Sequence, residues 1–321
     1  MSKRRQFAAV IAAFLLLVLF AGPYALDWFR PAWGYRAALV DWIKPDTRFQ
    51  VAIEDVRARK ADFVVDFYGL RYKGNTANLI DADLYYYGAY EKPELCLLRE
   101  TLRSLPQPVL IDVGANTGIY SMFAARYAKE VHAFEPFPPI LPRLRAHITE
   151  NNLTNVKVHA VGLGDAEAEL PFYSPPEANL GTGSFVAELK RENRYEQLTL
   201  KVVTGDAYFP TAGITRVDFI KMDIEGYEKA ALAGLRETLR RHRPIVLMEL
   251  SIDPAFPHLF KSLAELRSAF PENYEFLSFG GRNVRTGSYW LQGPLQASFD
   301  RPAQFNIVAR PIRSEEHTSE L

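Results

Sequence analysis

The sequence Val109-Leu-Ile-Asp-Val-Gly-Ala-Asn-Thr-Gly-Ile-Tyr-Ser121 decides the fold of this chain. A short, mostly β-branched run comes first, and apolar residues return at helical spacing after the glycines, which predicts a strand, a tight turn and a helix. Gly114 and Gly118 let the backbone bend sharply and approach a ligand, while the helix behind them offers unpaired N–H groups. The stretch therefore predicts a nucleotide-binding turn.

The spacing of this turn differs from that of a dinucleotide site. Dehydrogenases usually carry G-x-G-x-x-G, whereas here Gly114, Asn116 and Gly118 follow Asp112. S-adenosylmethionine has no phosphates, so its cradle need only hold an amino-acid carboxylate and ammonium, and Asp112 suits the ammonium. The alternative is a glycine turn with a purely structural role.

A second short apolar run, Val131-His-Ala-Phe-Glu-Pro136, also ends in a carboxylate. Glu135 lies about twenty residues beyond the glycines, where a Rossmann-like unit places the acid that accepts hydrogen bonds from the ribose hydroxyls. The same pattern would also fit a solvated glutamate at the end of a strand. The order and the distance favour a ribose-binding acid.

Three blocks in this order resemble the FkbM-type methyltransferases: Asp112–Gly118, Ala133–Pro136 and Lys221-Met-Asp-Ile-Glu-Gly-Tyr-Glu228. The resemblance extends over residues 60–310. It implies an α/β fold, a Rossmann-like, doubly wound and mostly parallel seven-stranded sheet. It also implies S-adenosylmethionine as the cofactor, and methyl transfer to a hydroxyl oxygen of a sugar, glycolipid or natural product.

The third block follows a predicted strand over residues 217–222, and its acids are the catalytic candidates. Methyl transfer requires alignment of the acceptor oxygen and removal of its proton. Asp223 is the first candidate for the base and Glu225 the second, with helix capping as the alternative role for Asp223. Lys221 is predicted to share a face with Asp223, where it would lower the pKa of that carboxyl group.

Ligands of open parallel sheets bind beyond the carboxyl ends of the strands, so Asp112, Glu135 and Asp223 are expected to converge. Asp223 and Glu249 could share a divalent cation, but two acids without a third ligand favour a metal-free site. Asp165 is either a partner of an adenine amino group or a turn residue. Two loops, residues 175–184 and 280–302, could contact the acceptor or serve as ordinary connections.

Composition excludes some classes of function. The 321 residues are 48% hydrophobic and 24% charged with a formal net charge of zero, as in a globular protein with one large domain and an extension. Without a long basic run, nucleic acid is not an expected partner. The single cysteine, Cys96, lies among leucines and is predicted to be a buried thiol.

The N-terminal residues predict a membrane anchor. Residues 7–26 follow Lys3, Arg4 and Arg5, carry no charge, and form a segment long enough to cross a bilayer as a helix. A cleaved signal peptide is the alternative. Basic residues are equally frequent before and after this segment, so the positive-inside rule does not decide its orientation. The cytosolic supply of S-adenosylmethionine favours a cytosolic catalytic domain. The predicted organisation is an anchor (1–26), a membrane-proximal linker (27–60), a methyltransferase domain (61–312) and a non-native polar tail (313–321).

Two other functions fit parts of this pattern. A nicotinamide-dependent oxidoreductase could use Glu135 equally well, although its glycine spacing is missing. A non-catalytic, membrane-tethered S-adenosylmethionine-binding scaffold would tolerate loss of Asp223 and Glu225. The acceptor and the oligomeric state are left open by the sequence.

Overall fold

The computed structural model describes residues 60–174, 182–186, 196–284 and 286–312. The described residues belong to two compact units, one with 60–67 and 72–90 and the other with 68–71 and 91 onward. The smaller unit contains helix α4 (Leu79–Tyr87), capped by the Asn78 side chain, and most of the two-stranded sheet of β1 (Asp62–Phe67) and β2 (Leu70–Asn75). The predicted domain boundaries remain predictions.

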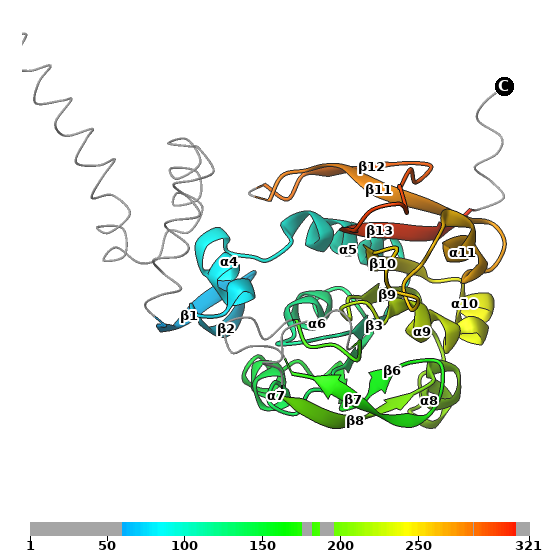
Figure 1. Ribbon diagram of the computed structural model, residues 1–321. Helices are drawn as coiled ribbons and strands as arrows, with labels where there is room; N and C mark the ends of the chain where they lie inside the picture. Colours follow the sequence, from blue (N-terminus) through cyan, green and yellow to red (C-terminus); the bar gives the residue numbers. More distant parts are fainter. Residues whose placement is uncertain (1–59, 175–181, 187–195, 285, 313–321) are drawn as a thin grey trace, which may run out of the picture. The chain divides into compact units, whose positions relative to one another are not determined.

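The larger unit is built on an eight-stranded sheet in the order β12-β11-β13-β10-β9-β3-β4-β5 (Figure 1). Five adjacent strands are parallel, and the last three in sequence are antiparallel. The strands are β3 (Val109–Val113), β4 (Glu130–Phe134), β5 (Val156–His159), β9 (Phe219–Met222), β10 (Ile245–Ile252), β11 (Tyr274–Arg282), β12 (Tyr289–Gln292) and β13 (Ala303–Pro311).

The mostly parallel α/β architecture confirms the predicted fold class, but the sheet has eight strands where seven were predicted. The additional strand, β12, lies within the predicted loop over residues 280–302. Its Trp290 indole lies against Gly280 and Gly281, where an added Cβ would come within 2.3 Å and 1.9 Å of the ring. Gly280 and Gly281 belong to the end of the preceding strand, β11, and because glycines are depleted in strands they hide the continuation of this hairpin in the sequence; in the structure the Trp290 ring covers them.

Helices lie along the sheet and complete the core. They are α5 (Lys92–Ser104), α6 (Ile119–Ala124), α7 (Leu141–Glu150), α8 (Gly205–Thr211), α9 (Glu228–Ala233), α10 (Arg236–His242) and α11 (Leu263–Ser268). One face of α5 is buried at Leu95, Leu98 and Leu102, which recur at helical spacing. Side chains from α8 to α11 pack with Ile111 and Val113 on one face of the main sheet.

All five residues of β3 are buried, as expected for a central parallel strand covered on both faces. Because side chains alternate along a strand, Asp112 points away from the Ile111 and Val113 side and meets Ser121 of α6. The strand thus carries a carboxylate into the interior at the end where the glycine turn begins.

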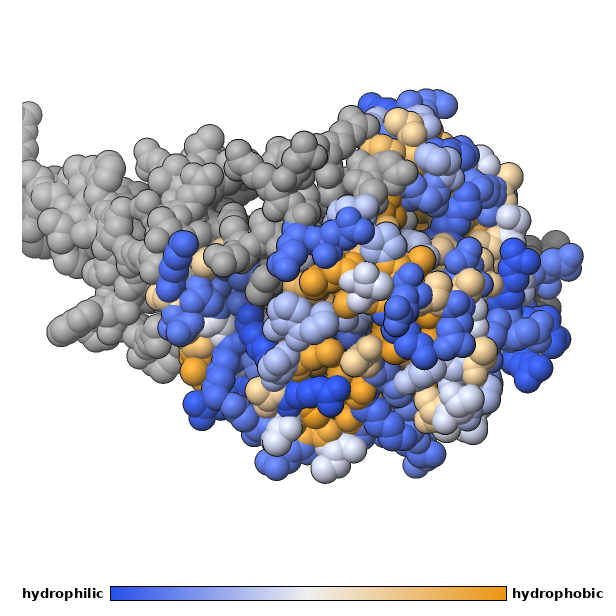
Figure 2. Space-filling view, turned by 60° about the horizontal axis from the view of Figure 1, so that its bottom comes forward, coloured by the Kyte–Doolittle hydropathy of each residue, from blue (hydrophilic) through white to orange (hydrophobic). Residues whose placement is uncertain are grey.

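A second sheet has the strand order β6-β8-β7. In the sequence its strands lie between β5 and β9. Its strands are β6 (Gly162–Leu163), β7 (Ala168–Tyr173) and β8 (Gln197–Val203). Figure 2 is turned to bring forward the side on which this sheet lies in Figure 1, and it shows apolar groups exposed among hydrophilic ones. The surface there is chemically mixed.

The predicted membrane localisation requires correction. Among the described residues, no helix is both long enough and apolar enough to cross a membrane, which overturns the prediction of a single-pass protein with a cytosolic catalytic domain. The predicted anchor (1–26), all but the last residue of the linker (27–60) and the tail (313–321) lie outside the described residues. The membrane therefore has no support as a partner.

Candidate active site

The glycine turn is pressed against the end of strand β9. Gly114 has a φ of +78°, and an added Cβ would lie 2.0 Å from the Asp223 carbonyl oxygen. The Gly114 and Ala115 N–H groups both donate to the Phe134 carbonyl, each at 3.0 Å. Gly118 has a φ of +92°, and its added Cβ would lie 2.6 Å from Leu144 of α7. Both glycines are required by geometry.

Glu135 lies against this turn, as the spacing predicted. Its Oε2 accepts from the Asn116 N–H at 2.8 Å, and its Oε1 accepts from the Phe137 N–H at 2.9 Å. Asn116 reaches this position with a φ of +50°, in the left-handed region. Burial raises the Glu135 pKa to about 7, against the lowering effect of these two bonds. The carboxylate is therefore fixed rather than solvated.

Asp112 is completely buried at the foot of the turn. Its Oδ2 accepts from the Ser121 hydroxyl at 2.6 Å. Its Oδ1 makes no hydrogen bond within the described residues and lies 4.0 Å from the Lys221 Nζ atom. Burial raises the Asp112 pKa, and Lys221 and Ser121 counteract that rise. One carboxylate oxygen is thus left for a further donor.

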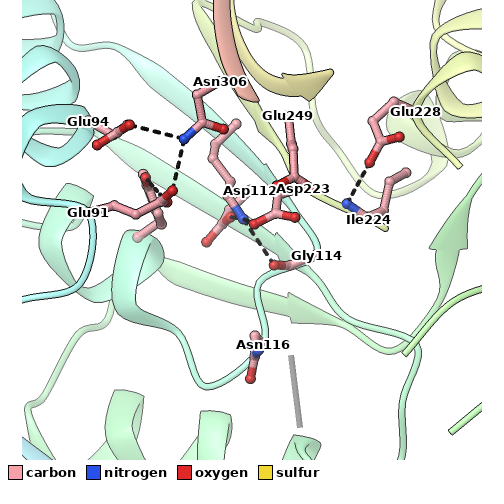
Figure 3. Close-up of polar contacts among 12 residues, drawn as sticks. Glu91, Glu94, Asp112, Gly114, Asn116, Asp223, Ile224, Glu228, Glu249 and Asn306 are labelled. Atoms are coloured by element: carbon pink, nitrogen blue, oxygen red, sulfur yellow. Dashed lines mark hydrogen bonds and ion pairs between the residues drawn. The ribbon is translucent and has the colours of Figure 1, made fainter. Parts of the chain in front are cut away.

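Lys221 supplies the positive charge at the centre of the site. Its Nζ lies 3.6 Å from Asp223 Oδ2 and donates to the Gly114 carbonyl at 3.3 Å. Figure 3 labels both of these partners. The same atom lies 4.9 Å from the centre of the Tyr120 ring. Burial lowers the Lys221 pKa, but the charges of Asp223, Asp112 and other acids outweigh it and raise the pKa overall. The side chain remains an ammonium.

Asp223 and Glu225 meet Glu249 of the neighbouring strand β10. One carboxylate oxygen from each lies within 4.8 Å of the others, a spacing that a hard divalent cation could use. Burial, followed by the charge of Asp223, raises the Glu249 pKa to about 9, and Gln304 donates to Glu249 Oε2 at 2.6 Å. The group can accept either a proton or a cation.

The structure brings together the site residues that the sequence predicted. Register pairs Asp112 of β3 with Ala133 of β4 and with Lys221 of β9, so these three strands end side by side. The Asp223 N–H donates to the Val113 carbonyl at 3.1 Å, which joins the third block to the first. Asp112, Glu135 and Asp223 therefore occupy one edge of the sheet. Asp165 is exposed, in the turn after β6.

Sequence reasoning missed a network that reaches the site from α5 and β13. Asn306 Nδ2 donates to Glu91 Oε1 at 2.8 Å and to Glu94 Oε1 at 3.0 Å (Figure 3). Arg282 lies 2.5 Å from Glu94. The Tyr120 hydroxyl donates to Glu91 Oε2 at 2.7 Å. Burial, with repulsion from Glu94, raises the Glu91 pKa to about 7.

Two of these residues lie at the ends of elements. Glu91 occupies the N-cap position of α5, but its side chain makes no capping hydrogen bond to that helix. Arg282 falls within the predicted loop over residues 280–302, whereas in the structure it ends β11 and contacts Glu94. Arg285 lies outside the described residues. Asn306 is 215 residues from Glu91 in sequence and Tyr120 is 29 residues from it, so no local pattern could have identified these partners.

Glu228 is a second residue that was missed. It is buried, and its Oε1 accepts from the Ile224 N–H at 3.0 Å and the Gly226 N–H at 3.2 Å. Burial raises its pKa to about 7, although these N–H groups lower it. It stabilises the loop that carries Asp223 and Glu225, and Glu225 itself has a φ of +54°. The D-x-E-G-x-E spacing was the available signal.

Comparison with known proteins identifies related sequences. Residues 112–276 match the profile described as the methyltransferase FkbM domain. Methyltransferase sdnD of Sordaria araneosa is 28% identical over 202 residues, 51% of this chain and 77% of sdnD. Hexuronic acid methyltransferase AglP of Haloferax volcanii is 28% identical over 147 residues, 46% of this chain and 58% of AglP.

Solved structures give a more distant likeness. A methyltransferase of Streptococcus mutans, crystallised with SAH, has a TM-score of 0.38 and 11% identity, covering 68% of this chain and 97% of that one.

Proposed function

The chain belongs to the FkbM methyltransferase family and is an S-adenosylmethionine-dependent methyltransferase, and we propose that it methylates a hydroxyl oxygen of a sugar or a related hydroxylated natural product. The observation that carries the proposal is the convergence of Asp112, Glu135 and Asp223 at adjacent strand ends. This membership removes the reason to retain a nicotinamide-dependent oxidoreductase as the alternative.

The residues of the glycine turn fit the donor. S-adenosylmethionine, when bound, supplies an electrophilic methyl group on a sulfonium. Gly114 lets the turn lie against the Asp223 carbonyl, which brings the first and third sequence blocks together, and Asp112 Oδ1 is a buried acceptor without a hydrogen-bond partner in the described structure. In this proposal, Asp112 and the turn bind the amino-acid end, while Glu135 accepts from the ribose hydroxyls.

Asp223 is the proposed base for the acceptor hydroxyl. It is partly exposed at the end of β9, so an acceptor can reach it, and Lys221 at 3.6 Å fixes its carboxylate. In this proposal Asp223 accepts the hydroxyl proton as the acceptor oxygen bonds to the methyl carbon and the carbon–sulfur bond breaks. Glu225 is the second candidate, and Lys221 orients Asp223 rather than contacting the acceptor, because it is buried.

Similarity to AglP supports a sugar acceptor. AglP acts on a hexuronic acid according to its name, and hydroxyl groups on such rings require a base to become nucleophilic. This chain spans little more than half of AglP, so the acceptor class is an inference for the chain and not a property transferred with the family.

Methyl transfer from labelled S-adenosylmethionine to a panel of free and lipid-linked oligosaccharides tests the proposal. We expect mass spectrometry to detect products heavier by one methyl substitution. Asp223→Asn should reduce kcat by about 10²- to 10⁴-fold with little change in donor affinity, since a general base is lost. Near-normal turnover of this variant would reject Asp223 as the base, and binding of donor without any turnover across the panel would favour a scaffold.

A further inference from the structure

A narrow apolar slot opens beside the glycine turn, within the larger unit. Strands β3, β4 and β6 form its fixed walls, with Val113, Phe134 and Leu163 among the residues that line it. The remaining wall is formed by Phe185, Tyr227 and Ile224, which come from outside these strands. The slot adjoins Gly114, so it lies next to the proposed ribose site at Glu135.

Phe185 closes this slot with its ring. The ring centre lies 5.3 Å from that of Tyr227 and 5.0 Å from that of Phe172. Across the slot, an added Cβ on Gly162 would lie 3.0 Å from the Phe185 ring, so glycine is what lets the ring approach β6. The half-buried ring therefore has aromatic neighbours on its outer side and a strand backbone on the other.

The residue before Phe185 attaches this wall to the acidic loop. Ser184 is fully buried, and its backbone exchanges two hydrogen bonds with Tyr173 at 2.9 Å and 3.2 Å. Its Oγ donates to the Glu225 carbonyl at 2.7 Å and accepts from the Val186 N–H at 3.0 Å. One hydroxyl thus joins the wall of the slot to the backbone between Asp223 and Gly226.

The slot is too small for the base of the donor unless part of its lining moves. Its volume is about 20 Å³, which is enough for a single water molecule and too small for a purine ring. The walls on β3, β4 and β6 belong to hydrogen-bonded strands. The wall at Phe185 is held by the contacts of Ser184 and by ring packing. Admission of a planar base therefore requires displacement of the lining outside these strands, which consists of Phe185, Ile224 and Tyr227.

We infer that Phe185 is the aromatic wall of an adenine slot, on which the base of the donor stacks, and that Ser184 couples this wall to the loop of Asp223 and Glu225. The inference rests on the proposed function, because it assigns the slot to the nucleoside of S-adenosylmethionine. It adds a base-recognition residue and a positioning residue that none of the three sequence blocks contains.

Calorimetric titration with S-adenosylhomocysteine and with adenosine tests the stacking role. Phe185→Leu, which keeps apolar bulk but removes the ring, should weaken both ligands by a similar factor of at least about fivefold. Phe185→Tyr keeps the ring and should retain affinity. The melting temperature of each variant identifies misfolded protein, and the Tyr variant serves as the matched control.

The outcomes separate this inference from the proposed function. Unchanged or tighter binding by Phe185→Leu would overturn the stacking role, because tighter binding would mean that the ring only fills an empty slot. Failure of the unmodified protein to bind either ligand would instead overturn the proposed donor site.

Steady-state kinetics test the positioning role of Ser184. Ser184→Ala should raise the KM for S-adenosylmethionine and lower kcat together, because the lost hydrogen bond reaches both the slot and the acidic loop. Ser184→Thr retains a hydroxyl and should restore most of both parameters. A Ser184→Ala enzyme with a lower melting temperature but unchanged kcat and KM would reduce Ser184 to a structural role and overturn the coupling.

Discussion

Lys221 holds several carboxylates together where their mutual repulsion would otherwise oppose folding. It is 7% exposed at the side chain and lies within 4.0 Å of both Asp112 and Asp223. Removing one partner from a buried ion pair leaves charge that neither water nor protein compensates, and this costs more than the pair contributes when intact. The lysine is therefore a structural requirement of the site as well as part of its chemistry.

Lys221→Met should destabilise the protein by about 3 kcal/mol in urea unfolding, since Asp112 and Asp223 lose their common cation. Lys157→Met is the matched control, because Lys157 pairs with Glu130 on the exposed surface and its loss should cost less than about 1 kcal/mol. Equal effects of the two substitutions would contradict the central role of Lys221.

Donor binding should strengthen as pH rises through about 7. Burial raises the Glu135 pKa from 4.5 to about 7, so the carboxyl group is mostly protonated at pH 6 and ionised at pH 8. Only the ionised form offers both oxygens as acceptors to ribose hydroxyls. We expect affinity for S-adenosylhomocysteine to rise about tenfold between these pH values. Glu135→Gln should bind weakly at both, and a pH profile like that of the unmodified enzyme would exclude Glu135 as the cause.

At the scale of elements, the turn after β3 packs directly against the end of β9, because Gly114 has no side chain. The close approach of the Asp223 carbonyl is possible only there, and the backbone is also in the left-handed region. Steric contact and backbone strain act together at this position. The first and third sequence blocks therefore depend on each other for their geometry.

Gly114→Ala should destabilise the protein by well over 2 kcal/mol and abolish donor binding, as measured by chemical unfolding and calorimetry. Gly213→Ala is the matched control. Gly213 has a similar φ of +74°, but nothing lies within 4 Å of its added Cβ, so only the backbone strain of about 1–2 kcal/mol remains. If both variants lose the same stability, the contact with Asp223 has no energetic role.

At the scale of the whole molecule, the features that could be predicted from the sequence are those that depend on residues close to one another in the chain. The parallel strands β3, β4 and β9 and the convergence of Asp112, Glu135 and Asp223 follow from short apolar runs and from acids at strand ends. The contacts of Asn306 and Ser184 could not be predicted. Asn306 is more than 200 positions from Glu91 and Glu94, and Ser184 is 41 positions from Glu225, and only tertiary packing decides such pairs.

The Asn306 network joins the end of the chain to α5, and a double-mutant cycle can measure it. Asn306→Ala should cost about 1–3 kcal/mol, because Glu91 and Glu94 lose a buried donor. When Asn306→Ala is combined with Glu91→Gln, the loss in the free energy of unfolding, measured in urea, should be smaller than the sum of the two single losses. Both substitutions remove the same interaction. Strict additivity would show that Asn306 and Glu91 are not coupled.

Strand β13 lies between β10 and β11, although it is the last strand of the sheet to be made. During synthesis at about 5–20 residues per second, β10 and β11 emerge from the ribosome before the segment that separates them. Until residues 303–311 arrive, the nascent chain carries two unpaired strand edges, which are templates for association with other chains. Emergence of residues 303–311, rather than completion of the nucleotide-binding half, is then the moment at which these two strand edges become paired and protected from association.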